Sequence, residues 1–525
     1  MSNETGCPMN RRAFLKALGV GAAATAATVG PAAVAGAAAG PPAGARGGAS
    51  SRAPFRATFG RMFPQLPAFA EPGPALTEAL IDIGRRGGIL DADDDLTADP
   101  LALILDPALR VNNPDNPTHT AGVTFMGQFM DHDVTFDVGS PLGVPTDPRL
   151  ATNGRTPALD LDSVYGLGPV ASPHLYDYGY KAKFHYEHGG MFEDVPRAAN
   201  MSAVIADPRN DEHVILSGLQ CAFMKFHNEA VEALGQPGMS DIETFNAARR
   251  LTTWHYQWMV VNQFLPLFVG QAMVDDVMRD GRRFFSTGDF MPVEFQGAAY
   301  RFGHSMIRPS YRANMNGQDG GPFIGLIFDA DADASEDPDD LVGGFRAPRR
   351  FVGWETFFEF GDGNVRNNKL IDTRLSSPLF NLPLSSIATG DQPTVLPQRT
   401  LLRHVTWSIP SGQAIAGAMG VPVVEAADLA ELSSYGLGLE ASTPLWYYVL
   451  KEAELMAGGR HLGPVGGRIV AEVFVGLLET DPNSYLNARK AWTPTLPRRS
   501  GQVTGDFEMV DFLTFAGVDP ASRNR

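Results

Sequence analysis

Four polar side chains, one amide, one imidazole and two carboxylates, stand close together in GQFMDHDVTF, residues 127–136. If this stretch is helical, Gln128 and His132 lie four residues apart and share one face, whereas Asp131 and Asp133 flank the imidazole on neighbouring faces. An imidazole with a pKa of about 6.5 can accept a proton and return it near neutral pH. The stretch therefore predicts a cluster that grips a ligand or moves protons. The alternative is an acidic helix turn without a chemical role.

Two further stretches carry charged or ligating side chains at short spacing. In IADPRNDEH, Arg209 precedes Glu212 by three residues, just before an expected long helix. In YRFGHSMI, Arg301 stands three residues before His304, and Gly303 lets a backbone or a flat group approach the imidazole. Taken singly, an Arg–Glu pair is most often a surface ion pair that stabilises little. These two stretches indicate a functional site only in combination with residues 127–136.

The elements that must position these side chains are expected to be helices. Apolar residues recur at helical spacing, and neither a run of short alternating strands nor βαβ spacing is found. The sequence predicts a mainly α protein with little β structure and with long loops, which its 56 Gly and 40 Pro favour. Helices are predicted at residues 214–234, 251–268, 443–456 and 464–478, with Thr443 as the N-cap of the third and Pro444 at its first helical position.

The overall composition narrows the class of partner. The 525 residues are 44% hydrophobic, which is enough for a large buried core, and their net charge is −17. An acidic chain without a clustered basic surface is not expected to bind nucleic acid or an anionic membrane surface. Cys221 lies in an apolar helical pattern, which predicts a buried thiol rather than a nucleophile.

The first 39 residues resemble a twin-arginine export signal, in which Arg11 and Arg12 precede a weakly apolar Ala/Gly-rich run. That run is too weak and too interrupted for a stable membrane anchor. The expected organisation is a signal peptide over residues 1–39, a flexible linker over 40–53 and one large domain over 54–525. The resemblance implies export by the twin-arginine machinery to a secreted or periplasmic location.

In combination, the three stretches resemble the animal-type haem peroxidases of the peroxidase–cyclooxygenase superfamily, and the likeness extends from about residue 124 to about residue 486. The family elements GQ-x-x-DHD, R-x-x-E and R-[FY]-G-H correspond, in order, to residues 127–133, 209–212 and 301–304. The resemblance implies a single haem peroxidase domain that binds haem b.

The resemblance assigns roles on both faces of the haem. His304 would be the proximal iron ligand, next to Arg301. On the distal face, His132 would move the proton of hydrogen peroxide, Arg209 would stabilise the charge that develops as the O–O bond breaks, and Gln128 would hold a water or substrate.

Three more positions follow from the same resemblance. The proximal imidazole needs an acceptor for its second N–H, which the family supplies with an Asn, and Asn381 in LFNLP is the candidate. Asp131 and Glu212 match carboxylates that form ester bonds to the haem in some relatives, and whether they do so here stays open. His213 stands where one branch has a haem-linking Met, so that link is excluded.

The resemblance also implies a calcium site. The family binds the ion with the Asp after the distal His, here Asp133, and with a loop that matches TPALDLD. In that loop the ligands would be Thr156, the carbonyl of Ala158, Asp160 and Asp162, where the family has Ser at the last position. Oxygen ligands at alternate positions are the ones calcium prefers.

The expected activity is that of a secreted peroxidase. It would reduce hydrogen peroxide and oxidise halide, thiocyanate or small aromatic donors through a ferryl intermediate; the sequence does not select among these reductants. One alternative is a fatty-acid dioxygenase, but Arg301 stands where those enzymes have a radical-forming Tyr, with Tyr300 one residue away. A second alternative is a non-catalytic binding or adhesion protein, which would have lost the distal groups.

Overall fold

The structure is a computed structural model that describes residues 58–523, except residues 138, 191, 287–289, 318–319 and 331–336. The predicted signal peptide and linker, and the start of the predicted domain, lie outside the described residues. The helices are α2 (Pro74–Ile83), α3 (Pro100–Leu105), α4 (Ala121–Val134), α5 (Asp162–Tyr165), α6 (Gly168–Ala171), α7 (Val214–Leu234), α8 (Asp241–Met259), α9 (Leu265–Val269), α10 (Gln271–Asp280), α11 (Val293–Gln296), α12 (Leu396–Thr406), α13 (Gly412–Met419), α14 (Leu445–Ala457), α15 (Pro464–Thr480) and α16 (Met509–Phe515).

Strands are short, and each described sheet has two of them. A parallel pair joins β1 (Phe59–Gly60) and β5 (Met291–Pro292); the antiparallel pairs are β2 (Asp115–Thr120) with β8 (Asn367–Lys369), β3 (Glu187–His188) with β4 (Glu193–Asp194), and β6 (Ser310–Arg312) with β7 (Ile324–Leu326). The mainly α fold with little β structure is therefore confirmed.

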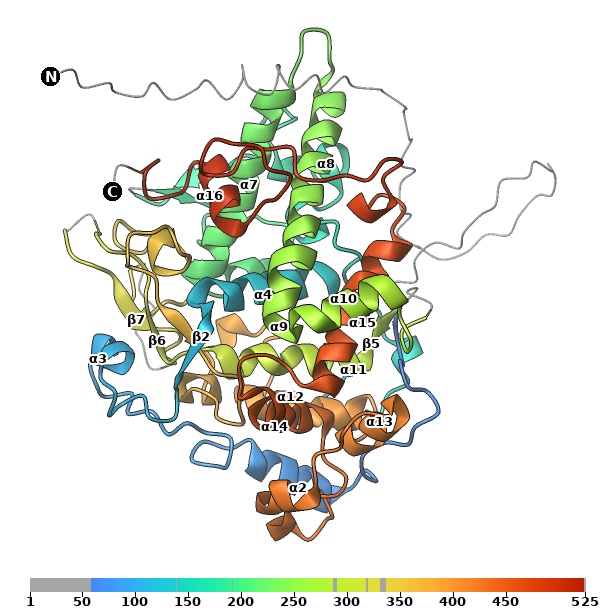
Figure 1. The fold of residues 1–525 in the computed structure, drawn as a ribbon. Coiled ribbons are helices and arrows are strands. Elements are labelled where there is room, and N and C mark those ends of the chain that lie inside the picture. The colour runs from blue at the N-terminus through green and yellow to red at the C-terminus, as the bar shows by residue number, and fades with distance from the viewer. Residues whose placement is uncertain are drawn as a thin grey trace, which may run out of the picture.

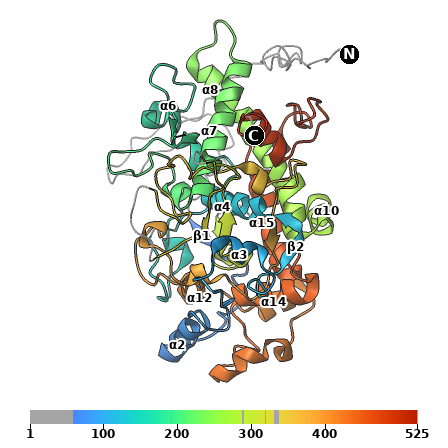
Figure 2. The same cartoon turned by 90° about the vertical axis from the view of Figure 1, so that its left-hand side faces the viewer.

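Helices α7 and α8 form a long pair, and α4 packs against α7 (Figure 1). Helices α2 and α14 lie at the end of the molecule away from the loop that joins α7 to α8 (Figure 2). The aromatic rings of Phe129 on α4 and Phe223 on α7 stack with centroids 4.6 Å apart, and Phe226 stacks on Phe512 of α16 at 4.3 Å. This packing fixes the helix that carries His132 within one continuous hydrophobic core.

The four predicted helices are confirmed, although two begin elsewhere. The first matches α7, and Cys221 on it is fully buried. The second begins ten residues earlier, because Ser240 and Glu243 form a capping box at the start of α8. In the third, Pro444 is itself the N-cap. The Thr443 hydroxyl donates to the Leu439 carbonyl rather than capping α14.

Two short turns complete the frame around the site. They are η3 (Pro208–Asp211), which leads into α7, and η5 (Ala299–Met306), which contacts α4, α14 and α15. Among the described residues, no helix combines the length and the apolar character needed to cross a bilayer.

Candidate active site

The structure brings the three motif stretches together around one cavity of about 230 Å³. Helix α4 contributes Gln128, Asp131 and His132 to its wall, and the segment that follows η3 contributes Glu212. The other motif residues in the wall are Gly127, Arg209, Arg301, Phe302, Gly303 and His304. Residues separated by more than a hundred positions in the sequence therefore share one chamber.

The distal imidazole is held in one tautomer. His132 Nδ1 lies 2.9 Å from Oδ1 of Asn210, whose amide nitrogen donates to Gln220 at 2.9 Å. Because the amide oxygen can only accept, Nδ1 carries the proton and Nε2 is left as an acceptor. Burial is the main cause that lowers the pKa of His132 to about 3, and the positive charge of Arg209 is the second. His132 is therefore neutral at physiological pH and ready to take a proton.

Arg209 is fixed by a buried clamp. Asp207 accepts from Nε of Arg209 at 3.0 Å and from its terminal nitrogen at 2.7 Å, and the same terminal nitrogen donates to the His132 carbonyl at 3.0 Å. The guanidinium also lies 4.3 Å from the centre of the Phe136 ring. A permanent cation is thus held beside the distal imidazole.

Gln128 belongs to a second distal network. Its amide nitrogen donates to Oε2 of Glu212, and its amide oxygen accepts from Nε2 of His213, both at 3.0 Å. Burial raises the pKa of Glu212 to about 8, although Arg209 opposes the shift. His213, which in the sequence was notable only as the absence of Met, orients Gln128 in the structure.

The proximal imidazole is oriented by a residue that the sequence analysis missed. Nδ1 of His304 lies 3.3 Å from Oγ1 of Thr400 on α12, and the Thr400 hydroxyl donates its own hydrogen to the Leu396 carbonyl at 3.1 Å. The imidazole is therefore the donor in the first contact, which leaves Nε2 free. On another side, the Trp446 ring packs edge-on, with centroids 6.0 Å apart.

The assignment of Asn381 as the proximal partner is wrong. Asn381 is an exposed residue directly after the turn Ser377–Phe380, and its N–H bonds to the Pro378 carbonyl of that turn. The short match LFNLP had suggested it. Thr400 instead stands on a helix whose sequence, LPQRTLLRHVT, offered no recognised signal beyond its apolar stripe.

The predicted calcium loop meets Asp133 at the buried end of α4. Carboxylate oxygens of Asp133, Asp160 and Asp162 lie within 4.8 Å of one another. Burial, and after it the charges of Asp160 and Asp162, raise the pKa of Asp133. Thr156 donates its N–H to Asp162 at 2.9 Å and lies in the same loop as Ala158. Arg155 lies 3.5 Å from Asp162 and Arg249 lies 3.8 Å from Asp160, so two guanidinium groups offset part of the negative charge of the cluster.

Comparison with known proteins agrees with this geometry. Residues 137–323, which include Arg209 and His304, match the family model described as animal haem peroxidase. Mouse (Mus musculus) eosinophil peroxidase is 26% identical over 183 residues, a match covering 31% of this chain and 25% of that protein. Drosophila melanogaster chorion peroxidase is 31% identical over 110 residues, or 19% of this chain and 14% of its own length. The chain thus matches only a quarter or less of the length of these two relatives.

Among solved structures, peroxidase A from Dictyostelium discoideum superposes with a TM-score of 0.53 at 15% identity, covering 82% of this chain and 89% of that chain. At this identity the likeness concerns the fold alone. Residues 137–323 therefore resemble the animal haem peroxidases in sequence, and the fold of the described chain resembles that of a solved peroxidase.

Proposed function

We propose that the protein is a haem peroxidase that reduces hydrogen peroxide and oxidises a halide, thiocyanate or a small aromatic donor. The observation that carries this proposal is the cavity itself, which has a neutral imidazole and a fixed guanidinium in one part of its wall and an oriented imidazole in another. These are the groups that peroxide cleavage at a haem iron requires.

The lining of the cavity fits haem. A Cβ added at Gly303 would meet no atom within 4 Å, so the backbone beside His304 faces open space. Two buried polar atoms in the wall, Oε1 of Gln296 and Oγ of Ser386, have no protein partner. Three guanidinium groups that could hold carboxylates also line it, those of Arg301, Arg399 and Arg403.

His304 would hold the iron through Nε2. When bound, haem would supply a redox-active iron with an open position for peroxide. His132 Nε2 would then accept the proton of one peroxide oxygen and return it to the departing oxygen, which leaves as water. Arg209 would stabilise the negative charge that develops during cleavage. Gln128, held by Glu212 and His213, would orient a water or the donor.

Two further features belong to the proposal. The three clustered carboxylates would bind calcium, which would tie α4 to the loop at residues 156–162 and so fix the position of His132. The twin-arginine-like leader supports a secreted or periplasmic location. Asp131 and Glu212 both line the cavity, which is compatible with covalent attachment of haem.

Fatty-acid oxygenation is the less favoured reading. The rice (Oryza sativa) fatty acid alpha-dioxygenase superposes with a TM-score of 0.50 at 15% identity, covering 73% of each chain, so only the fold is shared. Tyr300 donates its hydroxyl hydrogen to the Gly127 carbonyl at 3.0 Å, and a backbone carbonyl is too weak a base to take the phenolic proton that a tyrosyl radical must lose.

The test is reconstitution with haem followed by peroxide-dependent oxidation of iodide. Wild type and His132→Ala should both bind haem, but the variant should lose a factor of roughly 10² to 10⁴ in rate. His304→Ala should weaken haem binding itself. Replacement of the exposed His174 by Ala serves as the control and should change neither. Absence of haem binding by wild type, or full activity of His132→Ala, would refute the proposal.

A further inference from the structure

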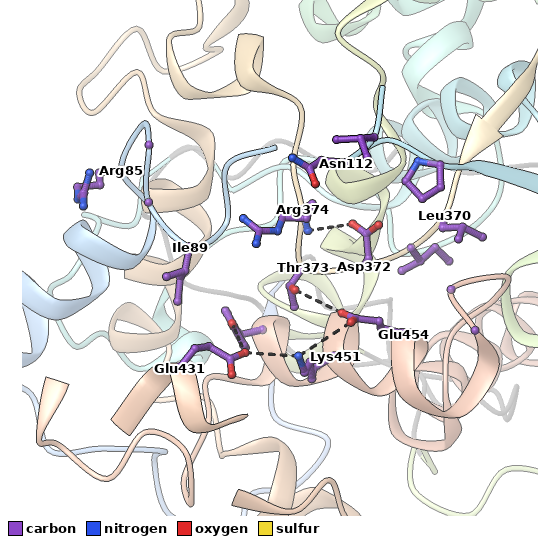
Figure 3. A pocket seen from close by; sticks show the side chains of 18 of the residues that line it. Arg85, Ile89, Asn112, Leu370, Asp372, Thr373, Arg374, Glu431, Lys451 and Glu454 are labelled. Carbon is purple, nitrogen blue, oxygen red and sulfur yellow. Dashed lines mark hydrogen bonds and ion pairs between the residues drawn. The ribbon is translucent and has the colours of Figure 1, made fainter. Parts of the chain in front are cut away.

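A second, larger pocket of about 790 Å³ opens on the surface and shares no lining residue with the haem cavity. We call it the α14 pocket, because Tyr447, Lys451 and Glu454 of helix α14 line it. Figure 3 shows Lys451 and Glu454 on that helix. The apolar side chains of the wall are those of Ile89, Val111, Pro114, Leu370 and Ile371, and Ile89 and Leu370 lie on opposite sides of the pocket (Figure 3). The rest is charged, with Arg85, Arg374 and Lys451 among acidic side chains.

The buried wall of the pocket holds a tyrosine with a proton acceptor. Tyr447 is 1% exposed, and its hydroxyl donates to Oε1 of Glu431 at 2.7 Å. Lys451 Nζ lies 3.6 Å from the same carboxylate oxygen, so the negative charge of Glu431 is balanced. A phenol that loses an electron must also lose its proton, and this carboxylate is placed to receive it.

The preceding residue on α14 contacts two residues that line the haem cavity. The fully buried Trp446 donates its indole N–H to the Arg301 carbonyl at 3.0 Å, and its ring lies edge-on to the His304 imidazole at 6.0 Å between centroids. A second connection runs through Ser305, whose hydroxyl donates to the carbonyl of the pocket residue Asp372 at 2.7 Å and accepts from its N–H at 2.9 Å. Tyr447 in the pocket wall and Trp446 beside the proximal imidazole are thus consecutive residues of α14.

We propose that the α14 pocket binds a phenolic donor, and that Tyr447 and Trp446 carry its electron to the proximal side of the haem site. This inference rests on the proposed function, which supplies peroxide as the oxidant. A phenol suits the pocket because its ring can lie against apolar side chains and a guanidinium of the wall, while its hydroxyl meets a charged side chain. It also matches Tyr447 chemically, so electron exchange between the two needs little driving force.

The electrons and protons balance as follows. Tyr447 gives one electron towards the haem site, and its phenolic proton moves to Glu431. The bound phenol then returns an electron to Tyr447, Glu431 returns the proton, and the proton of the phenol passes to water. Two phenols are oxidised to phenoxyl radicals while one hydrogen peroxide accepts two electrons and two protons and becomes two waters.

The experiment compares Tyr447→Phe with Tyr448→Phe in the haem-loaded protein. Tyr448 is the matched control, because it is also buried on α14 but its hydroxyl accepts from the Val424 N–H instead of donating to a carboxylate. Freeze-quenched samples taken after peroxide addition should show a tyrosyl radical by electron paramagnetic resonance in wild type and Tyr448→Phe, and not in Tyr447→Phe. Oxidation of a bulky phenol should fall about tenfold in Tyr447→Phe, with iodide oxidation unchanged.

Docking is tested separately by titrating the phenol calorimetrically. Val111→Arg, at a residue that is 74% exposed on the pocket wall, should abolish the binding isotherm without changing iodide oxidation. A tyrosyl signal that persists in Tyr447→Phe, a parallel fall of phenol and iodide oxidation, or unchanged binding in Val111→Arg would each overturn the inference. A wild type that binds haem yet oxidises no iodide would instead refute the proposed function.

Discussion

The sequence Asp-Pro-Arg occurs twice in the described chain with nearly the same hydrogen bonds but in opposite environments. At Asp207 the carboxylate accepts from the N–H and the Nε of Arg209, both at 3.0 Å, and from its terminal nitrogen at 2.7 Å. At Asp147 it accepts from the same three groups of Arg149 at 3.0, 3.0 and 2.6 Å. The side chain of Asp207 is fully buried, whereas that of Asp147 is 37% exposed.

We predict that Asp207→Asn destabilises the protein by about 3–5 kcal/mol, because it leaves the buried guanidinium of Arg209 without its counter-charge. Asp207 also accepts from Nε of Arg155 at 2.7 Å, so a second cation loses its partner. Asp147→Asn should leave stability within the error of the measurement, because water screens its pair. The two variants change the same chemical group in the same local motif, so the difference isolates burial.

The pH dependence gives the sign of the effect. Burial alone would raise the pKa of Asp207, but the neighbouring Arg209 outweighs it and holds the pKa well below its usual range. A carboxyl with a depressed pKa in the folded state adds stability that is present above its unfolded pKa and is lost as the pH falls towards the folded value. At pH 7 the contribution is therefore complete.

The assay is urea unfolding at pH 7, followed by circular dichroism, with equal m-values as a check on the two-state analysis. The peroxidase rate of Asp207→Asn should also fall, since Arg209 loses its orientation. Equal losses of stability in the Asp207 and Asp147 variants would show that burial does not determine the strength of the Asp–Arg pair. That result would refute the prediction.

Three other perturbations are predicted. A Cβ at Gly343 would lie 1.5 Å from the Asp211 carbonyl oxygen, so Gly343→Ala must displace the turn that carries Arg209. We expect this variant to lose about 1–3 kcal/mol of unfolding free energy, measured by urea unfolding. Gly417→Ala is the control, because a Cβ there meets nothing within 4 Å and the unfolding free energy should not change. Burial raises the pKa of Glu452 from 4.5 to about 7, so the folded state binds the extra proton and stability should fall as the pH rises through that window. Melting temperatures at pH 5 and pH 8 should show this fall in wild type, and a Glu452→Gln variant with the same fall would disprove it. Removal of calcium with EGTA should lower the melting temperature, and Asp162→Asn should abolish most of that response; a chelator without effect on wild type would remove the calcium site from the proposal.

Much of the site could be predicted from the sequence, because the groups that do chemistry lie in short stretches with a fixed local geometry. Gln128 and His132 share a face of α4 because an α-helix has 3.6 residues per turn. This relation depends only on their spacing in the sequence. The long helix α7 was predicted at both ends because its apolar pattern is strong and Gly235 follows it. The fold class followed from the same local patterns.

The partners of the two imidazoles could not be predicted in this way. Asn210 meets His132 across 78 positions of the sequence, and Thr400 meets His304 across 96, so each pair depends on how separate elements pack. A short motif such as LFNLP does not indicate which segments pack together in the folded chain. For this reason Asn381 was wrongly predicted as the partner of His304.

The sequence by itself determined which chemical groups the protein has and which local elements carry them. Only the tertiary structure decided the protonation of these groups and the side chains that hold them in place. Burial makes His132 neutral and fixes Arg209 against Asp207, and the packing of α14 against η5 places Trp446 beside His304. The physical reason is range: helix periodicity acts over a few residues, whereas desolvation and side-chain contacts depend on segments that meet only in the folded chain.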